Sequence, residues 1–154
     1  MNDVQIAKML EFVARCADAK KLRQIAINAD EKSVSTLAQA ARLKLYSILP
    51  NDDPGTIEYA VWQSIYALED VLKQERGKTI LLSRTRQKIG RQGVVACVAD
   101  LVLGKASDGF KMLEDRQMLK LSFEAIALQF PGKFDDRVLD AAKRRLGESD
   151  YEMK

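Results

Sequence analysis

The segment from Pro54 to Gly77 most strongly constrains what this chain can fold into. It follows the turn sequence NDDPG at residues 51–55, in which Asp53 can cap a helix and Pro54 can occupy its first position. Gly77 is a typical left-handed residue just after a helix end. The spacing therefore predicts one long helix from Pro54 to about Arg76.

Apolar residues lie on two sides of this predicted helix. At 100° per residue, an aliphatic row that includes one serine lies nearly opposite an aromatic row. The aliphatic row is Ile57, Val61, Ser64, Leu68 and Leu72, and the aromatic row is Tyr59, Trp62 and Tyr66. A helix that is apolar on both sides usually has neighbours on each side. We therefore expect this helix to be central, and we favour core packing over base stacking for the aromatic row.

Three shorter helices are expected in residues 1–50, where apolar residues repeat at intervals of three and four. Asp18 can cap the second of these helices, and either Asp30 or Ser33 can cap the third. Pro50 is expected to end the third helix.

Further short helices are expected after residue 93. The run at residues 93–104, GVVACVADLVLG, suits a strand or a helix, and we predict a helix because no second strand is available to pair with it. Ser107, Ser122 and Asp135 stand where helix caps are expected.

The expected fold is therefore all-α, with about eight helices in one compact bundle or in two small lobes divided near residues 76–83. Helix-turn-helix-like hairpins are expected in the C-terminal half. The predicted organisation is a helical unit at 1–76 that ends in the long helix, and a unit at 77–147 with a basic stretch and short helices. A flexible tail is predicted at 148–154.

Composition restricts the class of protein. With 154 residues, of which 47% are apolar and 31% charged, the chain has the composition of a soluble globular protein. No apolar run approaches the roughly 20 residues that cross a bilayer, and the N-terminus lacks the apolar core of a secretory signal. Cys16 and Cys97 lie in apolar helical patterns, which predicts buried free thiols and a reducing, cytoplasmic location.

The absence of histidine argues against most catalytic sites. Without histidine the chain lacks the commonest general base and cannot form a catalytic dyad or triad in which histidine activates a serine or cysteine. It also lacks a ligand that most zinc sites use. Paired carboxylates occur at Asp52 and Asp53 and again at Asp135 and Asp136, but both pairs stand where helices should begin. We therefore expect a protein without catalytic residues, metal site or cofactor.

The basic stretch, defined here as residues 73–92, is the feature that suggests a function. It contains seven basic residues and one acid, Glu75, although the whole chain carries a net charge of only +3. Such a local excess of cations attracts polyanions, and phosphate backbones first. A solvated surface is the plainer interpretation of the same residues.

From this stretch we predict a small non-enzymatic nucleic-acid-binding protein, for instance a bacterial regulator, with DNA favoured over RNA. The residues expected on phosphates or base edges are Arg76, Lys78, Arg84, Arg86, Gln87, Lys88, Arg91 and Gln92. The alternative is an adaptor or inhibitor that docks the stretch on an acidic protein surface, with the aromatic row as an anchor. A third interpretation is structural: Arg84, Arg86 and Lys88 would then pair with internal acids such as Glu69, Asp70 or Asp100.

Two segments are similar to helix-turn-helix DNA readers. In the first, residues 89–101, Gly93 is four residues after Ile89 instead of the usual five, and Val95 and Ala96 stand where polar side chains are expected.

The second segment, residues 121–146, resembles sigma-factor-type helix-turn-helix sequences in its EAIA core and its later AAKRRL. The resemblance implies that Asp136, Arg137 and Asp140 project from the second helix. A secondary basic patch of Lys143, Arg144 and Arg145 would then meet phosphates. A hairpin with a Pro-Gly turn is also common in all-α domains of other function.

Overall fold

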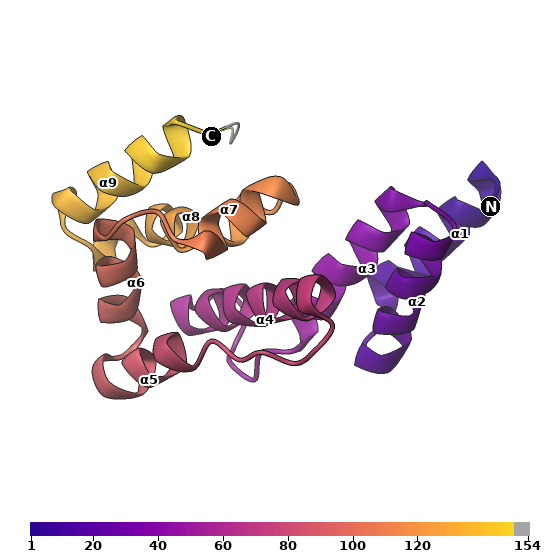
Figure 1. Cartoon of the computed structure of the whole chain (residues 1–154), viewed down its shortest axis with the longest axis horizontal. Coiled ribbons are helices and arrows are strands. Elements are labelled where there is room, and N and C mark those ends of the chain that lie inside the picture. The colour runs from indigo at the N-terminus through magenta and orange to yellow at the C-terminus, as the bar shows by residue number, and fades with distance from the viewer. Residues whose placement is uncertain (150–154) are drawn as a thin grey trace. The chain divides into compact units, whose positions relative to one another are not determined.

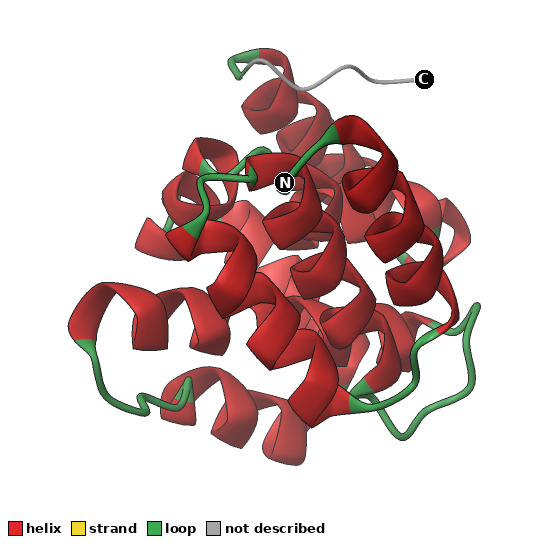
Figure 2. Ribbon diagram, turned by 90° about the vertical axis from the view of Figure 1, so that its right-hand side faces the viewer, coloured by secondary structure: helices red, strands yellow, loops and turns green. Residues whose placement is uncertain are grey.

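The computed structural model describes residues 1–149, which consist of helices and connecting loops (Figure 2). Within these residues there are nine α-helices, two short 3-10 helices and no strand, which confirms the all-α prediction. In the described part of the chain, no helix is both long and apolar enough to span a bilayer. The tail predicted at 148–154 lies outside the described residues from residue 150 onward.

The chain divides into two units, and the first is Met1–Pro50. It contains the three predicted helices α1 (Asp3–Arg15), α2 (Ala19–Glu31) and α3 (Ser35–Ile48). Helix α3 packs against both α1 and α2. Asp18 caps α2 as predicted, because its carboxylate accepts a hydrogen bond from the Lys21 backbone N–H.

The predicted cap of α3 is wrong. The helix begins after Val34, and no side chain caps it. Ser33 has a left-handed backbone with φ of 58°, and the Asp30 carboxylate instead receives two hydrogen bonds from the Arg42 guanidinium. Asp30 therefore joins α2 to α3, and it does not start a helix.

The second unit, Asn51–Lys154, contains the remaining helices (Figure 1). They are α4 (Ile57–Arg76), α5 (Ser83–Gln92), α6 (Val94–Leu103), α7 (Asp108–Asp115), η1 (Leu119–Leu121), α8 (Phe123–Gln129), η2 (Pro131–Lys133) and α9 (Asp136–Gly147). Helices α4, α6, α8 and α9 enclose a shared apolar core. Its buried residues include Ile57, Val61, Ile65, Val98, Val102, Ile126, Val138 and Ala142.

The boundary between the units differs from the one predicted after Arg76. The long helix α4 belongs to the C-terminal unit, because its aliphatic row packs on α6, α7 and α8. Every member of that row, from Ile57 to Leu72, is buried as predicted. Periodicity identified the buried side of α4 correctly, but it could not identify which helices cover that side.

Helix α4 begins later than predicted. Gly55 has φ of 91°, so the chain turns at Pro54 and Gly55 and does not yet enter the helix. Thr56 is the cap in place of Asp53, and its hydroxyl accepts a hydrogen bond from the Tyr59 backbone N–H. The predicted end is confirmed, because Gly77 is left-handed with φ of 71°.

The other local predictions for this unit are confirmed. Residues 94–103 form a helix, and the side chains of Ser107, Ser122 and Asp135 cap α7, α8 and α9. Cys97 in this unit and Cys16 in the first unit are buried free thiols, and burial raises the pKa of the Cys97 thiol above its ordinary value.

Candidate nucleic-acid interface

The basic stretch covers the last turn of α4, the loop at residues 77–82 and the whole of α5. Its seven cations fall into two groups. Arg86 and Lys88 are partly buried, and each forms an ion pair with an acid of another helix. The other five, which we call the exposed cations, are Lys73, Arg76, Lys78, Arg84 and Arg91.

Arg86 is held by Glu69 of α4. Its Nε and one terminal nitrogen donate hydrogen bonds of 2.8 and 2.7 Å to the two carboxylate oxygens of Glu69. The same carboxylate accepts a 2.8 Å bond from the backbone N–H of Leu82, at the start of α5. The Glu69 side chain is only 10% exposed, and its hydrogen bond raises the pKa of Arg86. Glu69 thus fixes the beginning of α5 on α4.

Two members of the aromatic row, Trp62 and Tyr66, lie beneath Arg86. The guanidinium carbon is 5.2 Å from the centroid of the Trp62 ring and 5.9 Å from that of Tyr66, within the range of cation–π contacts. Trp62 also packs against the apolar core. The row is therefore neither a fully buried core element nor a free aromatic surface, and part of it supports the arginine that positions α5.

Two further acids, one within the basic stretch and one on α6, also form ion pairs. The carboxylate of Glu75 is 3.1 Å from Arg116, and that of Asp100 is 3.4 Å from Lys88. The third interpretation is thus confirmed for Arg86 with Glu69 and for Lys88 with Asp100. Within residues 1–149, by contrast, none of the five exposed cations forms an ion pair.

The exposed cations lie on neighbouring surfaces. At 100° per residue, Arg84, Gln87 and Arg91 form one stripe on α5, which we call the exposed face of α5, and Lys88 lies at its edge. On α4, Lys73 and Arg76 lie one and two turns after Glu69, on the same side of the helix. Because Glu69 contacts the start of α5, this places both cations on the side of α4 where α5 begins.

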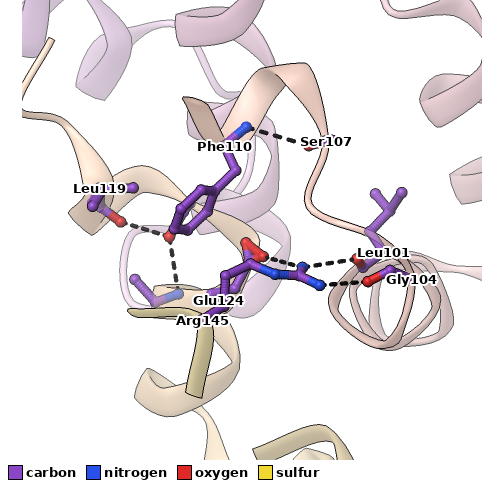
Figure 3. Close-up of polar contacts among 9 residues, drawn as sticks. Leu101, Gly104, Ser107, Phe110, Leu119, Glu124 and Arg145 are labelled. Carbon is purple, nitrogen blue, oxygen red and sulfur yellow. Dashed lines mark hydrogen bonds and ion pairs between the residues drawn. The ribbon is translucent and has the colours of Figure 1, made fainter. Parts of the chain in front are cut away.

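The secondary basic patch is not a patch of three free cations. Arg145 of α9 donates a 2.9 Å hydrogen bond to the carboxylate of Glu124 on α8, and it also donates to the carbonyl oxygens of Leu101 and Gly104 (Figure 3). Glu124 is 6% exposed and Arg145 is 17% exposed. Arg145 therefore joins α8 and α9 and satisfies carbonyls at the C-terminal end of α6.

Lys143 and Arg144 remain exposed, but they share the surface of α9 with two exposed acids, Asp136 and Asp140. The α8–α9 segment does form a helical hairpin, as predicted, and the two helices pack on each other. Its outer surface nevertheless carries mixed charge, and this makes it a weaker site for phosphates than α5.

The first segment that is similar to a helix-turn-helix, residues 89–101, covers the end of α5 and most of α6. Gly93, with φ of 84°, is the single residue between α5 and α6, and the two helices meet at a sharp corner (Figure 1). Val95 and Ala96 at the start of α6 are partly buried. The start of α6 therefore offers no polar surface, whereas α5 does.

Three of the predicted site residues pair with acids of their own chain, and the others are exposed. Arg76, Lys78, Arg84, Gln87, Arg91 and Gln92 are exposed, while Arg86, Lys88 and Arg145 form ion pairs with acids of their own chain. Glu69 was named as a possible partner under the structural interpretation, whereas the pairing of Glu124 with Arg145 was not predicted. One signal was available for Arg86: it lies three residues before the apolar Ile89, and so on the same side of α5.

Residues 1–149 contain no group of three side chains able to hold a metal ion. Comparison of the chain with protein-family models, with curated proteins and with solved structures gave no match.

Proposed function

We propose that this protein is a small cytoplasmic nucleic-acid-binding protein, for instance a bacterial regulator, without an enzymatic activity of its own. One observation carries the proposal: the exposed cations have no acidic partner within the described residues, while three acids around them are already paired. A concentrated, uncompensated positive charge is the usual basis for binding a phosphate backbone.

An acidic protein surface would be attracted by the same charge. A stable protein interface usually also needs a large apolar or aromatic anchor that can enter a pocket on the partner. All three residues expected to serve as that anchor are partly buried, and Trp62 and Tyr66 also lie beneath Arg86. Phosphate binding needs no such anchor, and we therefore favour it over the adaptor.

The first test is a fluorescence-anisotropy titration of the protein with a labelled mixed-sequence nucleic acid, as duplex and as single strand. If all five exposed cations contact duplex phosphates, the logarithm of the affinity should fall with the logarithm of salt concentration with a slope of about −4.5. Between about 50 mM and about 200 mM salt, the affinity should then fall by two to three orders of magnitude.

The absence of binding at the lower salt concentration would refute the proposal. An unlabelled poly-glutamate competitor provides a further check, because it presents carboxylates in place of phosphates. Displacement of the nucleic acid by poly-glutamate at equal concentrations of charge would favour an acidic protein as the partner.

A further inference from the structure

Helix α5 has the surface of a helix that enters a groove. Its ten residues, SRTRQKIGRQ, span about 15 Å and include no acid, and none of them is fully buried. The side towards the protein is formed by Arg86 and Ile89, which contact Glu69 and the apolar core respectively. The opposite side, which is the exposed face of α5, is free to meet a partner.

The order of side chains on that face is informative. Arg84 and Arg91 lie two turns apart, about 10 Å along the helix axis, and Gln87 lies between them. Gln92 is about 80° away from Arg84 around the helix, towards the side that faces the protein. Two cations therefore flank a single carboxamide, which can donate and accept hydrogen bonds at the same time.

We propose, building on the proposed nucleic-acid binding, that the partner is duplex DNA and that α5 lies in its major groove. Arg84 and Arg91 contact phosphates at the edges of the groove, and Gln87 reads a base between them. The B-form major groove is about 12 Å wide and admits an α-helix. A glutamine side chain pairs with adenine through two hydrogen bonds, donating to N7 and accepting from N6.

The same surface is less suitable for single strands and for RNA duplexes. Proteins that hold single strands stack the bases on exposed aromatic rings, and the rings next to α5, Trp62 and Tyr66, are covered by Arg86. The major groove of an RNA duplex is deep and narrow, so side chains cannot read it. Duplex DNA is the nucleic acid that a polar, basic helix without exposed aromatics fits best.

Both ends of α5 are attached to the rest of the unit, and this supports a role for the helix in recognising bases. Glu69 receives hydrogen bonds from both Leu82 and Arg86, so the start of the helix is fixed on α4. Gly93 joins the other end directly to α6, which is part of the apolar core. A base-reading side chain needs such support, because small displacements of the helix would break its paired hydrogen bonds.

The experiment uses a short labelled DNA duplex, one of its strands alone, and an RNA duplex of the same sequence, each titrated with the full chain. We expect the tightest binding to the DNA duplex. A selection from a randomised DNA duplex pool should show a preference for adenine at one position, by about five- to a hundred-fold over other bases.

Gln87→Ala should remove this preference and leave the salt dependence unchanged, because phosphate contacts do not involve the carboxamide. Gln92→Ala is the matched control on the same helix, and it should keep the preference.

The inference is overturned if the single strand or the RNA duplex binds as tightly as the DNA duplex. It is also overturned if the wild-type protein selects no base, or if Gln87→Ala retains the selected one. In these cases salt-dependent binding would still uphold the proposed function. The absence of binding to all three probes would overturn both.

Discussion

Replacement of Arg145 by alanine is expected to lower the free energy of unfolding of the C-terminal unit by about 3 to 5 kcal/mol. The variant leaves the carboxylate of Glu124, which is 6% exposed, buried without its cation. It also removes the donors to the carbonyl oxygens of Leu101 and Gly104. Urea unfolding followed by circular dichroism measures the change, and a marginally stable domain would lose a large part of its stability.

Arg144→Ala is the matched control, because it removes the same type of side chain from an exposed position one residue away. Its effect should stay within about 0.5 kcal/mol. The double variant Glu124→Ala with Arg145→Ala should be less destabilised than the sum of the two single variants, because no charge is left unpaired. Equal effects of the Arg144 and Arg145 variants would show that Arg145 does not hold the helices together.

The second large effect is expected for Arg86→Ala, at about 2 to 3 kcal/mol of unfolding free energy. This variant removes two hydrogen bonds to Glu69 and uncovers the rings of Trp62 and Tyr66. Because Trp62 is the only tryptophan of the chain, acrylamide quenching reports its exposure directly. Quenching should increase in the variant, and the urea midpoint should fall.

Arg84→Ala serves as the control for Arg86→Ala, since both remove an arginine from the same helix. It should leave quenching unchanged and alter stability by no more than about 0.5 kcal/mol. If Arg84→Ala destabilised the protein as much as Arg86→Ala, the division of α5 into an anchoring side and an exposed face would be incorrect.

Local sequence rules predicted much of the fold. The caps at Asp18, Ser107, Ser122 and Asp135 and the glycine at the end of α4 depend on residues within one turn, so a short window of sequence contains the relevant information. The start of α4 was misplaced because the positive φ of Gly55 allows the chain to turn before the helix begins. The choice between Asp53 and Thr56 as the cap depends on that turn.

Long-range pairing was the part that sequence could not decide. Glu69 precedes Arg86 by 17 residues, and Glu124 precedes Arg145 by 21, so each pair depends on how two helices pack. The sequence of the basic stretch shows how many cations it contains. Which of them face the protein depends on the angular position of each residue around its helix. For Arg145 that position was visible in the sequence, because Arg145 lies seven residues after the buried Val138 and so on the same side of α9.

We propose that the exposed cations of α5 bind phosphates, whereas Arg86, Lys88 and Arg145 stabilise the fold. The most direct test measures the salt dependence of DNA binding for the wild-type protein and for two double variants. One is Arg84→Ala with Arg91→Ala, and the other is Lys143→Ala with Arg144→Ala. Both remove two positive charges, from α5 in the first variant and from α9 in the second.

We predict that the slope of log affinity against log salt becomes less steep by about 1.8 in the Arg84 and Arg91 variant, since about 0.9 is lost for each phosphate contact. The Lys143 and Arg144 variant should keep the wild-type slope. Equal slopes for the wild-type protein and the Arg84 and Arg91 variant would contradict the claim.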